Sequence, residues 1–174
     1  IALLLVSFFN KFPKLENFGH KISMLMAILF LIISFQLKNL PNSISISFLK
    51  LPGNFNFVFL FNSSQMLLLL LLGVFWLMVC LQANRYFLIT EDSKKSKFHI
   101  LLLLIVGFLA AIILSKNLLT ILLFYQLLAA TLYFTANYFS PSRSVKSAKY
   151  FGFFTIATSS LLFLAASLTF KISG

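Results

Sequence analysis

The chain alternates between long apolar runs and short segments that hold most of its charges and all four prolines. A helix that crosses a bilayer needs about 20 predominantly apolar residues. On this pattern we expect about six membrane spans, at residues 1–9, 22–37, 55–83, 99–114, 117–139 and 150–170. The first run is short, so either it crosses only part of the bilayer or the chain extends before it. No small-residue cleavage site follows it, so we do not expect a signal peptide.

The third run contains a polar patch, Asn62-Ser63-Ser64-Gln65, which is expected to mark the mouth of a helix and to leave residues 66–83 as the crossing. No segment shows the long alternation of apolar and polar residues that a membrane β-barrel requires. The pattern therefore predicts an all-helical polytopic bundle, a single transmembrane domain over residues 1–174, and no strands.

Composition supports a membrane protein. Apolar residues make up 60% of the chain and charged residues 10%, and the mean hydropathy is +1.01, values outside the range of soluble globular domains. The net charge of +11 comes from residues at the ends of the runs, which favours anionic lipid over nucleic acid as the partner.

The positive charges also predict an orientation. The connections after the first, third and fifth runs hold three, four and three Lys or Arg residues, ten in all, whereas the other connections and the tail hold four. Lys and Arg accumulate on the cytoplasmic or matrix side of membrane proteins. These three connections are therefore expected on that side.

Gln126 is the tenth residue of the fifth run, about 14 Å along a helix axis and hence near the bilayer centre. Ala129, Ala130 and Tyr133 share its face of the helix. The amide either makes an interhelical hydrogen bond or lines an ion pathway, and we weigh the first more heavily. Because an amide cannot titrate, Gln126 could order water in a proton route but could not carry the proton.

Lys149 precedes the sixth run. It is either a lysine that extends to the membrane interface, the more common case, or one held inward so that it can exchange a proton. Ser160 and neighbouring hydroxyls on the same helix could hold a water chain, although ordinary interhelical hydrogen bonds are the more common function of such groups.

The remaining candidate residues give weaker indications of a function than Gln126 and Lys149 do. Cys80 has no second cysteine to pair with, Trp76 is expected to pack inside its span, and His20 and His99 are expected at the interface. The sequence has no phosphate-binding glycine loop, no metal-ligand spacing and no nucleophile triad. We therefore expect no catalytic, metal-binding or cofactor-binding residues in this chain.

The fifth and sixth runs read NLLTILLFYQLLAATLYFTANYF and SVKSAKYFGFFTIATSSLLFLAASL. With the basic connection between them, they resemble the antiporter-like membrane subunits of respiratory complex I. The run Ala148-Lys149-Tyr150-Phe151 and the following serine pair resemble most the subunit 2 group of that family, the NADH dehydrogenase subunit 2 proteins. Upstream, FNFVFLFNSSQMLLLLLL is similar to the family's segment that opens the third span, so the resemblance covers roughly residues 55 to 170.

The chain departs from the family pattern at two positions. The family's glutamate of the fifth span corresponds to Gln126, and its aspartate at the third span corresponds to Asn62. Complete family members have about fourteen spans, so the resemblance implies an N-terminal half. Either a second polypeptide supplies the remaining spans or the subunit is reduced.

The resemblance implies a non-redox subunit of the H⁺-translocating NADH:ubiquinone reductase, in the inner mitochondrial membrane. NADH, FMN, the iron-sulfur clusters and ubiquinone would be bound by other subunits. The implied proton-translocation residues are Lys149, Gln126, Tyr133 and Ser160, and the implied partners are other membrane-arm subunits. Two alternatives remain at this point: a subunit of a multisubunit cation/proton antiporter, and a purely structural membrane subunit of a respiratory assembly.

Overall fold

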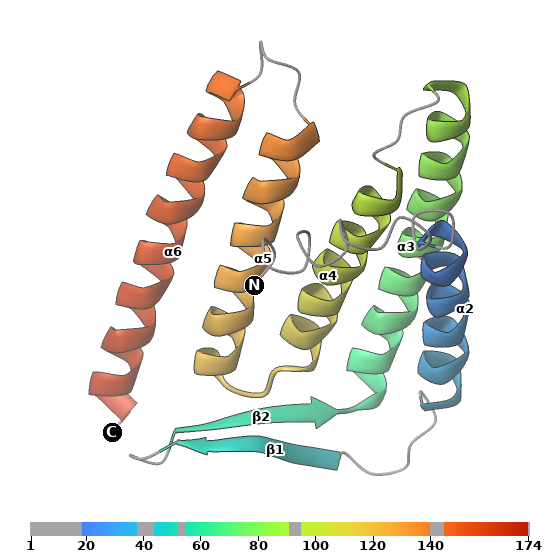
Figure 1. Cartoon of the computed structure of the whole chain (residues 1–174). Helices are drawn as coiled ribbons and strands as arrows, with labels where there is room; N and C mark the ends of the chain where they lie inside the picture. The colour runs from blue at the N-terminus through green and yellow to red at the C-terminus, as the bar shows by residue number, and fades with distance from the viewer. Residues whose placement is uncertain (1–18, 38–43, 52–54, 91–94, 140–144, 174) are drawn as a thin grey trace.

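The computed structural model describes residues 19–37, 44–51, 55–90, 95–139 and 145–173 (Figure 1). The elements, in chain order, are α2 (Gly19–Leu37), β1 (Ile44–Leu51), β2 (Phe55–Phe61), α3 (Ser63–Thr90), α4 (Lys95–Leu114), α5 (Leu118–Phe139) and α6 (Val145–Ser173). The first expected span, residues 1–9, and the neighbourhood of His20 lie outside the part whose side chains are described.

Four helices contain stretches long and apolar enough to cross a membrane, namely Ser63–Phe87, Lys97–Leu114, Leu118–Ala136 and Lys149–Thr169. The apolar stretch of α2, Lys21–Leu37, is shorter. The expectation of a polytopic helical membrane protein is therefore confirmed. Within the described ranges, however, the helices that meet the length for crossing number four.

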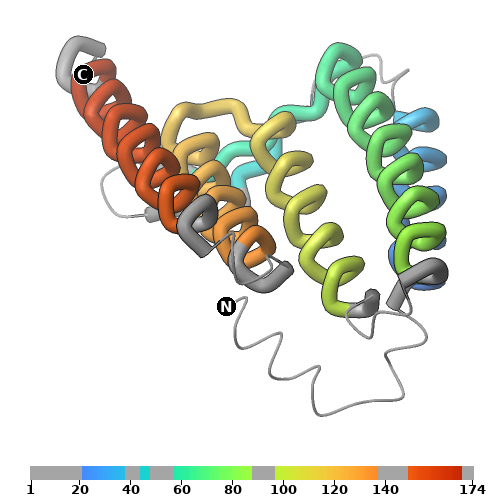
Figure 2. Tube along the Cα trace, turned by 90° about the horizontal axis from the view of Figure 1, so that it is seen from above, coloured from blue at the N-terminus to red at the C-terminus, as the bar shows by residue number. Residues whose placement is uncertain are grey.

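The helices lie in the order α2, α3, α4, α5 and α6 in both views (Figures 1 and 2). α2 packs on α3 and α4, α4 packs on α5, and α5 packs on α6. Successive helices run in opposite directions, so α3 and α5 end, and α4 and α6 begin, toward one end of the bundle (Figure 1). Arg85 lies in the last part of α3, Lys97 in the first turn of α4 and Lys149 in the first two turns of α6. We call this end of the bundle the basic end, and the opposite end the hairpin end.

At the hairpin end, β1 and β2 form an antiparallel pair, with Ile44 opposite Phe61 and Leu51 opposite Phe55. The prediction of no strands is wrong here. The segment that was assigned to the start of the third apolar run is β2, and the helix begins only at Ser63. Two short strands pair with each other outside the helices, so they need no barrel to satisfy their backbone groups.

The outer edge of β2 is joined to the turn between α4 and α5. The Lys116 N–H donates to the Val58 carbonyl at 2.9 Å, and Phe59 forms a bridge pair with Ser115. The Phe59 ring lies 5.8 Å from that of Phe124 on α5. A backbone hydrogen bond and an aromatic side-chain contact thus hold the hairpin against the helices.

The best-packed region lies between α2, α3 and α4, around Ala27, Trp76, Cys80 and Val106. Trp76 meets Phe30 edge to face at 5.9 Å, as expected for a packing residue. The Ser23 hydroxyl and the Cys80 thiol form a hydrogen bond of 3.3 Å between α2 and α3. Since lipid tails are as apolar as leucine, such polar contacts and close packing hold membrane helices together.

Two local expectations had different outcomes. Asn62 caps α3, because its side-chain oxygen accepts from the Ser63 N–H at 2.7 Å, so the polar patch does mark the start of the helix. His99 was expected at the interface, but it is 2% exposed. His99 lies in the first turn of the apolar stretch Lys97–Leu114, and protein atoms rather than solvent surround its side chain.

Candidate functional site: the groove between α5 and α6

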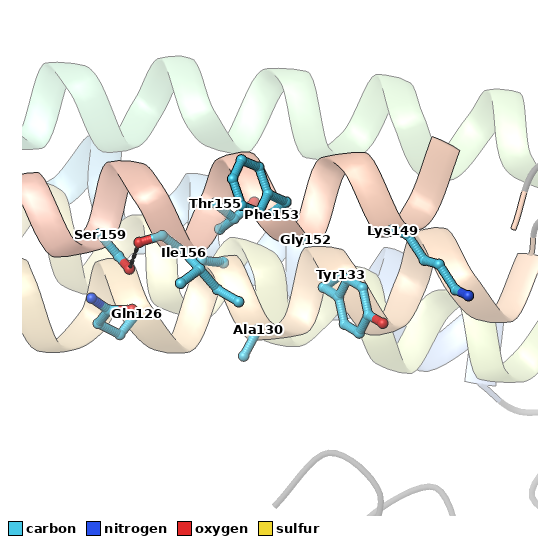
Figure 3. Close-up of a pocket in the computed structure, with 10 residues that line it drawn as sticks. Gln126, Ala130, Tyr133, Lys149, Gly152, Phe153, Thr155, Ile156 and Ser159 are labelled. Atoms are coloured by element: carbon cyan, nitrogen blue, oxygen red, sulfur yellow. Dashed lines mark hydrogen bonds between the residues drawn. The ribbon is translucent and has the colours of Figure 1, made fainter. Parts of the chain in front are cut away.

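A groove of about 400 Å³ runs along α5 and α6, and we refer to it as the α5–α6 groove (Figure 3). Helical spacing explains its composition, since residues three, four and seven apart share one face. From α5 it is lined by Gln126, Ala129, Ala130 and Tyr133, and from α6 by Lys149, Gly152, Phe153, Thr155, Ile156 and Ser159. Gln126, Tyr133 and Lys149, three of the four candidate residues, are therefore brought together.

The two helices approach each other closely at Gly152. A Cβ atom added to this glycine would lie 2.8 Å from Cε2 and 2.9 Å from Cδ2 of Tyr133. The tyrosine ring therefore packs directly on the α6 backbone. The absence of a side chain at Gly152 fixes the position of the Tyr133 ring in the groove.

The polar side chains form two groups along the groove (Figure 3). Gln126 lies beside Ser159 at the inner end, and the hydroxyl of Tyr133 points toward the end at which Lys149 lies. Lys149 is exposed and is the first residue of the apolar stretch Lys149–Thr169. Its ammonium therefore stands at the mouth of the groove, at the basic end of the bundle.

Ser160 does not line the groove. It is exposed, and its hydroxyl donates to the Ala157 carbonyl of its own helix at 2.8 Å. Ser159, which is buried, lines the groove instead of Ser160, the residue that the sequence analysis predicted for a proton route. Counting from Lys149 in steps of three and four leads to either serine, and only the relative rotation of the two helices distinguishes them.

The α6 hydroxyls near the groove are already used as donors. Ser159 donates to the Ile156 carbonyl at 2.8 Å and Thr155 to the Phe151 carbonyl at 2.6 Å. Such bonds satisfy a hydroxyl within an apolar helix. These oxygens can still accept hydrogen bonds, so the donors that the groove offers to another molecule are those of Gln126, Tyr133 and Lys149.

None of the ten lining residues is acidic. The acidic residues of the chain are Glu16, Glu91 and Asp92, all outside the described ranges. The described residues contain no cluster of His, Cys, Asp or Glu suited to a metal ion. The groove offers one positive charge and neutral donors over apolar walls, which suits an anion or ordered water.

A second hollow, of about 280 Å³, lies along the same two helices. Ala129 and Thr155 line both hollows, and the rest of the second is mostly aromatic and aliphatic. Hollows on both sides of the contact show that α5 and α6 meet along a narrow strip, in contrast to the closely packed region around Trp76.

The sequence matches no family model and no curated protein.

Proposed function

We propose that the chain is an antiporter-like membrane-arm subunit of the proton-pumping NADH:ubiquinone oxidoreductase, corresponding to the N-terminal part of a subunit 2-like protein. It would reside in the inner mitochondrial membrane, with the basic end toward the matrix, beside other membrane-arm subunits. Redox chemistry would take place in other subunits. This chain would supply packed helices and part of the proton-translocation module.

One observation carries the proposal. The two helices with the family-like sequences, α5 and α6, lie side by side, and Gln126, Tyr133 and Lys149 line one groove between them. Residues 23 positions apart in the chain, Gln126 and Lys149, line opposite ends of this groove, with the Tyr133 ring between them. In this proposal Lys149 exchanges protons at the basic end, and Gln126 with Ser159 orders water farther in.

Membership in the complex is tested by purifying the tagged chain in a mild detergent and identifying its companions by mass spectrometry. We expect flavin- and iron-sulfur-containing subunits, together with a polypeptide that carries further spans. A preparation that contains only cation/proton antiporter subunits would favour the alternative that the chain is a subunit of a multisubunit cation/proton antiporter. A chain that is stable alone would contradict both.

The proton-relay function of Lys149 is tested separately. In reconstituted membranes, Lys149→Met is expected to reduce the protons pumped per NADH oxidised and to leave the complex assembled, because Lys149 is exposed and fills no core position. An unchanged ratio would show that the lysine only marks the membrane interface. Lys21→Met, at an exposed lysine in the first turn of α2 and outside the α5–α6 groove, is the matched control and is expected to pump normally.

A further inference from the structure

We propose that the α5–α6 groove is a binding site for one anionic phospholipid, whose phosphate pairs with Lys149 and whose acyl chain lies along the apolar walls. The inference goes beyond the proposed function and does not depend on it, since a groove of this chemistry would hold such a lipid in any membrane assembly. Three observations support it: the depth of Lys149 in the bilayer, the charge at the mouth of the groove and the shape of the groove.

The depth of Lys149 matches that of a lipid phosphate. α6 has 29 residues, a length of about 43 Å, whereas the hydrocarbon core is about 30 Å thick. Lys149 lies four residues after Val145, about 6 Å from the start of the helix, close to half of the excess length. The apolar stretch begins at this residue. Its ammonium therefore lies where hydrocarbon gives way to headgroups.

The charge at the mouth favours an anion. Lys149 is the charged residue among those lining the groove, and Tyr133 directs its hydroxyl toward the same end (Figure 3). The N-terminus of α6, with its positive helix dipole, is one turn away. Arg85 in the last part of α3 and Lys97 in the first turn of α4 lie toward the same end of the bundle. Basic pockets between helices on the cytoplasmic or matrix side are suited to anionic headgroups.

The shape of the groove fits an acyl chain. From Lys149 to Ser159 is ten residues, about 15 Å along α6. The walls between the two ends are apolar and small, since Ala129, Ala130 and Ile156 line them and Gly152 contributes no side chain. Phe153 and Ile156 are 69% and 70% exposed, so the groove opens sideways to the hydrocarbon. A lipid can enter laterally and extend its chain inward from Lys149.

The other occupant that the charge would suit is a neighbouring helix with a carboxylate. A carboxylate inside the hydrocarbon needs its cation at the same depth, because an unpaired ion there is costly. Lys149 instead lies at the boundary and is exposed, which favours a headgroup. A partner helix is therefore treated as an outcome of the experiment.

The experiment uses the full chain in its native assembly, reconstituted in bilayers with a photoactivatable phosphatidylglycerol or, separately, a phosphatidylcholine carrying the reactive group in its acyl chain. Cross-linked peptides are identified by mass spectrometry. We expect the phosphatidylglycerol probe to label α5 and α6 peptides in preference to the phosphatidylcholine probe. Equal labelling by both probes would overturn the proposal, as would the absence of any labelling of groove residues, the result expected if a partner helix fills the groove.

Variants distinguish the lipid from other anions. Lys149→Met should reduce phosphatidylglycerol labelling about fivefold, the ratio expected for losing one lysine at an anionic membrane surface. Lys149→Arg should retain it, and Lys21→Met should leave it unchanged. Ile156→Trp, which fills the groove without changing the charge, should abolish acyl-chain labelling there. Full displacement by inorganic phosphate would identify a soluble anion and would contradict the lipid assignment, as would normal labelling of Lys149→Met.

Lys149→Arg also separates this inference from the proton relay. Arginine keeps its charge and binds phosphate well but cannot give up a proton under physiological conditions. If Lys149 exchanges protons, the arginine variant pumps poorly whether or not the lipid is bound. If Lys149 holds a lipid as a fixed charge, the variant retains both labelling and pumping. The labelling result does not depend on which companions purify with the chain, so it tests the lipid site even if the proposed function is wrong.

Discussion

Small side chains decide how closely the helices of this bundle approach. A Cβ atom on Gly73 of α3 would lie 2.7 Å from Cδ2 of Leu31, and one on Gly152 of α6 would lie 2.8 Å from the Tyr133 ring, but one on Gly107 of α4 would have no neighbour within 4 Å. Within lipid, close approach contributes much of the association energy of helices, because there is no hydrophobic driving force between them.

Gly152→Ala is therefore expected to lower the thermal stability of the protein in detergent. The added methyl must displace the Tyr133 ring, and overpacking of this kind costs about 1 to 3 kcal/mol. Gly107→Ala is the matched control. It adds the same methyl in open space and should leave stability equal or raise it by up to about 1 kcal/mol, the difference in helix propensity. Equal melting temperatures for the two variants would contradict the contact.

The amide of Gln126 is half-buried beside a groove rather than inside a closed core. Gln126→Glu should therefore be tolerated, because the small residues Ala129 and Ala130 leave space beside it and the Tyr133 side chain lies on the same face of α5. Leu128→Glu puts the same charge at a position that is 8% exposed and should prevent assembly. The measurement is the amount of assembled complex on a native gel. Loss of the complex in Gln126→Glu would show that the amide has become purely structural.

At the scale of elements, the hairpin is the feature that apolar run length alone misses. Residues 44–47 alternate Ile and Ser, phenylalanine recurs at every second position from Phe55 to Phe61, and Pro52-Gly53-Asn54 between them is typical of a turn. A search for barrel strands of about ten residues overlooks strands of eight and seven. Helix run lengths, by contrast, predict α4, α5 and the core of α6 closely.

Phe59→Ala should loosen the hairpin from the bundle. The change removes the ring contact with Phe124, worth roughly 1 kcal/mol, and leaves the pairing of β1 with β2 intact. Hydrogen-exchange mass spectrometry should show faster exchange in β2 and in the turn between α4 and α5, with α2 and α3 unchanged. Leu60→Ala, on the opposite face of the same strand, is the control and should cause little change there. Equal effects of both variants would show that the aromatic contact does not hold the hairpin.

At the scale of the whole molecule, both the charged residues and the buried contacts are unevenly distributed. Among the described residues, Arg85 of α3, Lys97 of α4 and Lys149 of α6 lie in the parts of these helices nearest the basic end. Packing is uneven as well, since α2, α3 and α4 share a buried cluster, whereas the apolar stretch of α6 is only 11% buried. α6 thus presents most of its surface to lipid or to a neighbouring subunit.

The orientation can be measured with single cysteines. In a Cys80→Ala background, Arg85→Cys lies in the last part of α3, toward the basic end, and Lys116→Cys lies in the turn between α4 and α5, at the hairpin end; both positions are exposed. In right-side-out membranes, a membrane-impermeant maleimide should label Lys116→Cys, whereas Arg85→Cys should react only after permeabilisation. The opposite labelling would place the basic end outside and would contradict the positive-inside assignment.

The sequence by itself determined the class of protein, most helix positions and the start of α3 at its polar cap. These properties depend on local composition and on bilayer thickness, which act on each segment independently. Tertiary structure decided that Ser159 rather than Ser160 lines the groove, that His99 is buried and that β2 pairs with β1 and the turn after α4. Each of these depends on the rotation or pairing of segments distant in the chain, which helical periodicity leaves undetermined.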